Sequence, residues 1–175
     1  MATLARNTTV IGTLLVGFAS PVWGKLDLGV IAYLQGDYAA ALRECRPAAE
    51  QGNAVAQTIL GVLFHRGLGV QQDVEEARRW YHLAAEQGLA SAQYYLGRLY
   101  VESAGTERDP VQAFMWMDLA ASQGSRDFVR ARDALMEVMT PAQIAEGRKL
   151  TKEWKSRERT SRSQVLPVRR ALSSS

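Results

Sequence analysis

The segment that determines the fold is Ala84-Ala85-Glu86-Gln87-Gly88, because closely related segments occur 36 residues to either side of it. Residues 48–52 have the same five letters, and residues 120–124 read Ala-Ala-Ser-Gln-Gly. Other residues keep this register, namely Asp37, Asp73 and Asp109, Ala41, Ala77 and Ala113, and Trp80 and Trp116. A period of this length is typical of a solenoid, in which each unit stacks on its neighbours to bury its apolar face.

The second unit shows how one repeat is built. Apolar residues at helical spacing predict a first helix over 53–66, and Gly67 is expected to end it because glycine readily adopts positive φ. Asp73 is placed to cap the second helix, with Glu76 three residues later as in a capping box. Gly88 is expected to end that helix. The repeat is therefore a pair of antiparallel helices.

Small residues recur where the two helices of a unit are expected to meet. Gly61 and Ala77 leave room for a close approach of the helices, and Trp80 and Trp116 are expected to fill the space beside it. Glycine within a helix is unfavourable by about 0.5–1 kcal/mol relative to alanine, so its return at one register indicates a packing requirement.

The C-terminal part predicts a cap on the array. Residues 125–139 resemble another first helix, but Arg132 and Asp133 stand where the third unit has Leu96 and Gly97. Charges there are typical of a terminal repeat with a polar outer face. The segment 140–143, Thr-Pro-Ala-Gln, predicts a last helix that ends at about residue 154. The fold class is therefore all-α, an α-solenoid of about three repeats plus a C-terminal capping helix pair, over residues 25–155.

The two ends of the chain differ from this body. Residues 1–24 contain one charge, Arg6, and a short apolar run over 8–19, which predicts a cleaved signal peptide, with an uncleaved anchor as the alternative. The protein is therefore expected to be exported, periplasmic or secreted, with no transmembrane segment in the mature chain. Residues 156–175 are expected to form a basic disordered tail. The net charge from residue 152 onward is +5, and that of residues 25–151 is −3.

These residues resemble the Sel1-like repeat family, whose helical pairs are related to tetratricopeptide repeats. The second unit matches that pattern from residue 56 to residue 88, and segments 37–42 and 139–144 look like the opening and closing segments of small exported bacterial members. The resemblance implies an adaptor or assembly scaffold of the bacterial envelope, with no shared catalytic residues.

Residues that could carry chemistry are few. His65 and His82 are expected on different helices without a Cys or carboxylate cluster at metal-ligand spacing, so neither a metal site nor a cofactor is predicted. Cys45, the single cysteine, shares its register with Tyr81 and Met117. It is interpreted as a buried apolar residue, with intermolecular pairing as the alternative. No nucleophile stands beside a recognisable base, so no catalytic residue is predicted.

Partner-binding residues are predicted on the first helices, which line the concave side of such solenoids. Positions that vary between repeats are the candidates: Thr58 and Val62 are replaced by Tyr94 and Arg98, and then by Arg130 and Ala134. Tyrosine and arginine are enriched where binding energy concentrates. The predicted binding residues are Tyr94, Arg98 and Arg130, with His65 and Tyr95 nearby; ordinary solvated helix residues are the alternative.

The sequence thus predicts a non-enzymatic scaffold of the bacterial envelope that binds an unknown protein partner through its concave face. The alternative is a cell-wall-directed protein, either β-lactamase-like or peptidoglycan-binding. Relatives with such activity carry paired cysteines in each repeat, whereas this chain has a single cysteine. Envelope association through the basic tail is a third hypothesis. Nucleic acid is not an expected partner, because the protein is expected to be exported.

Overall fold

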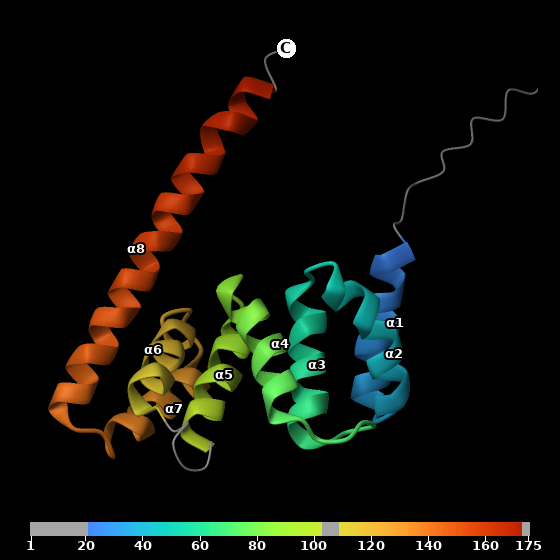
Figure 1. Cartoon of the computed structure of the whole chain (residues 1–175), viewed down its shortest axis with the longest axis horizontal. Helices are drawn as coiled ribbons and strands as arrows, with labels where there is room; N and C mark the ends of the chain where they lie inside the picture. Colours follow the sequence, from blue (N-terminus) through green and yellow to red (C-terminus); the bar gives the residue numbers. More distant parts are fainter. Residues whose placement is uncertain (1–20, 103–108, 173–175) are drawn as a thin grey trace, which may run out of the picture.

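In residues 21–102 and 109–172, which the computed structural model describes, the chain forms eight helices and no strand (Figure 1). Side chains are described for residues 26–102 and 109–161. The helices are α1 (Pro21–Gln35), α2 (Tyr38–Glu50), α3 (Ala54–Arg66), α4 (Val74–Glu86), α5 (Ala90–Glu102), α6 (Pro110–Ala121), α7 (Arg126–Met136) and α8 (Pro141–Leu172). The all-α solenoid predicted from the repeat is confirmed.

Each second helix of a pair begins at an aspartate that caps it. Asp37 accepts a hydrogen bond from the Ala40 N–H at 3.0 Å, and Asp73 accepts one from the Glu76 N–H at 2.9 Å. Asp109 does the same for the N–H groups of residues 111 and 112. These bonds satisfy N–H groups that the first turn of a helix leaves unpaired, and they explain the return of aspartate at this register.

The capping box predicted at Asp73 forms only in part. The Asp73 N–H donates to the Phe64 carbonyl oxygen at 3.0 Å, and the Glu76 carboxylate pairs with Arg79. The Asp73 N–H is therefore satisfied by the preceding helix and leaves the Glu76 side chain available to Arg79. The box predicted at Thr140 does form, since the Gln143 side chain accepts from the Thr140 N–H at 2.9 Å and Thr140 Oγ1 accepts from the Gln143 N–H at 3.3 Å.

Within each pair, a glycine of the first helix lies against a larger side chain of the second. A Cβ placed on Gly61 would lie 2.5 Å from the Tyr81 ring, and one on Gly97 would lie 2.8 Å from the Met117 side chain. Gly29 faces Cys45 in the same way. The sequence predicted close packing at Gly61, but the side chain it accommodates is Tyr81 rather than Trp80. Cys45, Tyr81 and Met117 therefore share one register because each packs against the glycine of its own helix pair.

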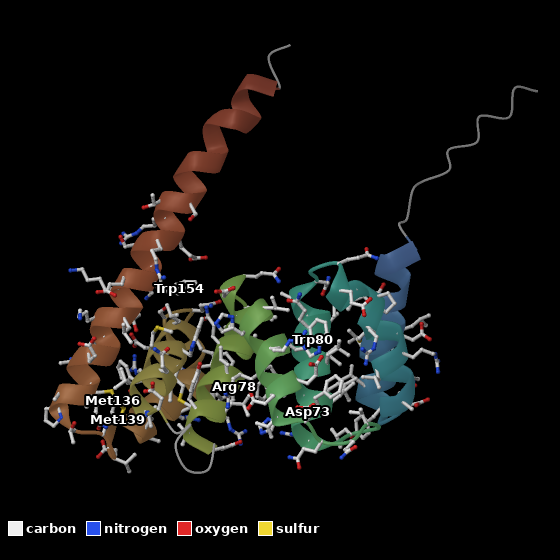
Figure 2. All side chains as sticks on the ribbon, viewed as in Figure 1. Asp73, Arg78, Trp80, Met136, Met139 and Trp154 are labelled. Atoms are coloured by element: carbon white, nitrogen blue, oxygen red, sulfur yellow. The ribbon has the colours of Figure 1, made fainter. Side chains whose placement is uncertain are left out.

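The pairs stack so that their apolar seams form one core. Trp80 and Trp116, which the sequence placed in that core, are 7% and 4% exposed. Figure 2 shows Trp80 among the packed helices of the body. Cys45 is fully buried, as predicted, and it is a free thiol. Burial raises the pKa of this thiol to about 11.

A chain of glutamine side chains joins successive repeats. Gln57 of α3 is buried and donates to the Ala49 carbonyl oxygen at 3.0 Å, while its own oxygen accepts from Gln87 at 2.8 Å. One repeat later, Gln93 donates to the Ala85 carbonyl oxygen at 3.2 Å and accepts from Gln123 at 3.0 Å. The glutamine of the recurring Ala-Ala-x-Gln-Gly segment therefore donates a hydrogen bond to the buried glutamine side chain of the first helix. This bond explains why glutamine recurs at that register.

The C-terminal cap differs in detail from the predicted helix pair. Both α7 and α8 pack on α6, and they contact each other little. Gly147 of α8 lies against Phe114 of α6, and the Trp154 ring meets that of Trp116 edge to face at 6.2 Å. On α7, Arg132 bonds Asp118 of α6 at 3.2 Å. The charges on α7 thus take part in the cap as ion pairs.

The expected boundaries of the body and the tail need one correction. The last helix does not end at about residue 154, because α8 continues to Leu172. Residues 156–172, expected to be disordered, are therefore helical. At the other end α1 begins at Pro21, within the segment expected to be a signal peptide. Residues 1–20, which hold its apolar run, lie outside the described residues, and the signal peptide stays a prediction.

Candidate partner-binding surface

The first helices of the pairs form the inner wall of the curved array. Helix α3 contacts both α1 and α5, whereas the second helices α2, α4 and α6 make at most weak contacts with one another. Elements on the inside of a curve lie closer together than those on the outside, so the α1, α3 and α5 side is concave. We call the exposed side of these three helices the inner wall. The concave position of the first helices stays a prediction, which these contacts favour.

An apolar hollow of about 250 Å³ opens on the inner wall between α1, α3 and α5. Its lining residues are Tyr33 from α1, Val55, Thr58, Ile59 and Val62 from α3, and Leu89, Ser91 and Tyr95 from the start of the next repeat. The hollow exists because repeat two carries the small side chains Thr58 and Val62 where repeat three carries Tyr94 and Arg98. Val55, one of the residues that line it, is 45% exposed.

Aromatic rings support one end of the hollow. The Tyr95 ring stacks on that of the fully buried Tyr81, with centroids 5.4 Å apart and planes 15° apart. The His65 ring meets Tyr81 edge to face at 6.2 Å. Within the described residues the Tyr81 hydroxyl has no hydrogen-bond partner, and burial raises its pKa well above the usual range. Tyr95 is therefore held in place from below by a rigid aromatic side chain.

A polar group adjoins these rings at the end of α5. Glu102 pairs with Arg98 and also lies 3.3 Å from His65 Nε2, so it links the second and third repeats. Arg98 in turn lies over the Tyr94 ring, 5.9 Å from its centroid. Burial lowers the pKa of His65, although Glu102 opposes that shift. Desolvation is the larger of the two causes, so neutral imidazole is the favoured form.

The structure brings together four of the five residues predicted to bind a partner. His65, Tyr94, Tyr95 and Arg98 form one connected group on α3 and α5, and Tyr94 also stacks on Phe128 of α7 at 5.1 Å. Arg130 lies apart from this group on α7, where it is exposed and near Asp127. Of the five, Tyr95 lines the apolar hollow.

Sequence reasoning missed most of the hollow because it searched for large side chains. Tyr33, Val55, Ile59 and Leu89 line the hollow and were not predicted as binding residues. The signal for it was the small side chain at positions 58 and 62, which the repeat comparison identified as variable. At a variable position on a concave face, a large side chain indicates a contact residue and a small side chain indicates a hollow.

The described residues offer little for catalysis or metal binding. Among them there is no group of three His, Cys, Asp or Glu side chains that could hold a metal ion. His82 lies 3.7 Å from Glu86 and against the Trp116 ring, apart from His65. In the same residues, no helix is both long enough and apolar enough to span a bilayer.

The fold and the inner wall define an α-solenoid of helix pairs. The Sel1 repeat model matches residues 54–89 and 90–125, and by these two repeats the chain belongs to the Sel1-repeat family. The pair α1 and α2 has the same packing but lies outside the matched residues. Its connection between the equivalent glycine and aspartate is four residues shorter than in the later pairs.

Among the solved structures that are similar to this chain are two bacterial proteins. One is c5321, a protective antigen present in uropathogenic Escherichia coli strains that displays an SLR fold. It is 32% identical with a TM-score of 0.72, and the match covers 83% of this chain and 32% of that protein. The other is a Sel1 repeat protein from Oxalobacter formigenes, 30% identical with a TM-score of 0.58, where the match covers 72% and 54%. The chain thus spans about a third and about half of these relatives, and no curated protein matches it.

Proposed function

We propose that this protein is a non-enzymatic adaptor of the bacterial envelope that holds a protein partner on its inner wall. Sel1-repeat proteins are generally protein-interaction scaffolds, and both similar structures come from bacteria. The apolar run over residues 8–19 supports export to the periplasm or the medium. The specific partner surface is the hollow together with Tyr95 and its polar neighbours.

The observation that carries this proposal is the apolar hollow between α1, α3 and α5. Apolar side chains that enter such a space lose contact with water, and aromatic residues at its edge add contact area at a low entropic cost. The polar group of His65, Arg98 and Glu102 lies beside Tyr95 and is suited to orient the partner's backbone or polar side chains. The partner therefore presents an aliphatic or aromatic side chain as its anchor.

The proposal can be tested with a variant that fills the hollow with a side chain the fold already accepts. Thr58→Tyr places at this register the residue that repeat three carries as Tyr94. Tyr95→Ala removes the aromatic edge instead. The matched control is Leu83→Tyr on α4, an exposed position on a second helix, away from the inner wall.

Crosslinked capture from the native envelope, quantified by mass spectrometry, supplies the readout. We expect a set of proteins to be recovered with the unaltered chain and with the Leu83 variant, and to be lost with both Thr58→Tyr and Tyr95→Ala. Recovery that is the same for all four proteins would contradict binding at the inner wall. Hydrolysis of nitrocefin by the purified chain would instead favour the cell-wall-directed alternative.

A further inference from the structure

The long helix α8 carries a basic stripe that the repeat pattern does not explain. Arg148, Lys152, Lys155 and Arg159 follow one another at intervals of four, three and four residues. At 3.6 residues per turn, these intervals place the four residues on one side of the helix. Arg148, Lys152 and Arg159 are exposed and Lys155 is half-buried. We call these four residues the basic stripe.

The basic stripe is separate from the side of α8 that packs on the body. That side consists of Gly147 against Phe114, the buried Thr151 and the half-buried Trp154. Figure 1 shows α8 extending well beyond the other helices, and Figure 2 shows Trp154 near the point where it last meets them. The stripe therefore runs from the body onto the projecting part of the helix.

Acidic residues of α8 do not neutralise the basic stripe. Glu146 pairs with Lys149, which lies off the stripe. Glu153 stands about 100° around the helix from Lys152, and Glu158 stands about 60° from Lys155. Among the described residues, none of the four stripe cations forms an ion pair. In most of the body, by contrast, arginines beside acids are paired, as Arg79 is with Glu76. The stripe is thus a line of uncompensated positive charge about 16 Å long.

We propose that the basic stripe of α8 docks the protein on the surface of a bilayer that contains anionic lipids. A straight row of cations on a projecting helix can approach many lipid headgroups at once, and each basic residue adds to the attraction. The sequence continues the spacing with Arg162 and Arg169 and places Val165, Leu166 and Val168 between them. Basic and apolar residues interleaved on one helix are typical of helices that lie in a membrane interface.

The test uses the whole chain and vesicles made of equal parts phosphatidylcholine and phosphatidylglycerol. We expect the protein to sediment with these vesicles at low salt and not with vesicles of phosphatidylcholine alone. Salt at about 1 M, where the Debye length is about 3 Å, should release it. The variant with all four stripe residues changed to Gln should bind at least about tenfold more weakly.

A control variant distinguishes the effect of where the charges lie from the effect of the net charge on membrane binding. Changing Arg43, Arg46, Lys149 and Arg157 to Gln removes the same net charge from exposed sites off the stripe, and it should alter binding less than about twofold. Residues 8–19 stay in both variants, so any membrane affinity of that apolar run cancels. Equal loss of binding by the two variants, no preference for anionic vesicles, or tighter stripe-dependent binding to duplex DNA at the same salt would overturn the proposal.

Discussion

Gln87 donates from Nε2 to Oε1 of the buried Gln57, 2.8 Å away, although the two residues are 30 positions apart in the chain. Gln57 in turn donates to the Ala49 carbonyl oxygen of the preceding repeat. The amide of Gln57 therefore lies between two repeats and is satisfied at both ends. A buried amide with one end unsatisfied would be destabilising, so this relationship ties the recurring Gln of the repeat segment to the stability of the stack.

This relationship predicts different effects for the same substitution in two repeats. Gln87→Ala removes the donor to Gln57 and should lower the free energy of unfolding by about 1 kcal/mol. Gln51 occupies the same cap position at the end of α2, is exposed and has no such partner among the described residues. Gln51→Ala should change stability by less than about 0.5 kcal/mol. Urea denaturation followed by circular dichroism checks both values; equal effects would contradict the account.

The close contact of Gly61 with Tyr81 predicts a reversal of the usual effect of alanine. Gly→Ala within a helix normally stabilises by about 0.5–1 kcal/mol. At Gly61 the new Cβ would lie 2.5 Å from the Tyr81 ring, so we expect a loss of about 1–3 kcal/mol. In a Tyr81→Ala background the same change should cost less. Thermal unfolding of the four proteins of this cycle provides the measurement, and a stabilising Gly61→Ala would show that the ring moves aside freely.

Cys45 is predicted to be chemically inert in the folded protein. Its thiol is fully buried, and this burial raises its pKa from an ordinary value of 9.0 to about 11. The smaller thiolate fraction alone lowers the reaction rate about a hundredfold, and burial lowers it further. Iodoacetamide labelling at about pH 8 should therefore be slow in buffer and fast in urea. Rapid labelling of the folded chain would indicate an exposed thiol and reopen the intermolecular disulfide as an alternative.

The lowered pKa of His65 predicts how the stability of the protein depends on pH. Burial lowers its pKa in the folded state below the ordinary value near 6.5, so below that value the unfolded chain binds the proton more readily. Stability contributed by neutral His65 is present above pH 6.5 and is lost as the pH falls through the folded pKa. The difference in stability between His65→Gln and the unaltered chain should therefore change in this window. A difference that is flat from about pH 7.5 to pH 5 would contradict the shift.

Much of the fold could be predicted because individual residues recur at the 36-residue period and reveal the repeat. The aspartates at the start of the second helices, the buried Trp80 and Trp116, and the capping signal at Thr140 each have a local physical reason and each is confirmed. The helical extension of α8 could not be predicted in this way. The residues after 155 include few large apolar side chains, so composition alone favoured disorder.

The candidate site was only partly predictable, for a different reason. Variation between repeats directed attention to the first helices and to positions 58, 62, 94 and 98. It could not show that the side chains at 94 and 98 contact neighbours within the fold, since Tyr94 stacks on Phe128 and Arg98 pairs with Glu102. The space left by Thr58 and Val62 depends on three helices from successive pairs, and only the assembled structure displays it.

The central claim, that a partner occupies the inner wall, is tested most directly by a photoreactive amino acid placed at single positions in the native cell. We expect a discrete crosslinked protein when the probe replaces Tyr95, and none when it replaces the exposed Arg79 on α4. The Tyr95 adduct should disappear when Thr58→Tyr fills the hollow. Adducts formed equally from both positions, or a Tyr95 adduct that survives the filled hollow, would contradict binding at the inner wall.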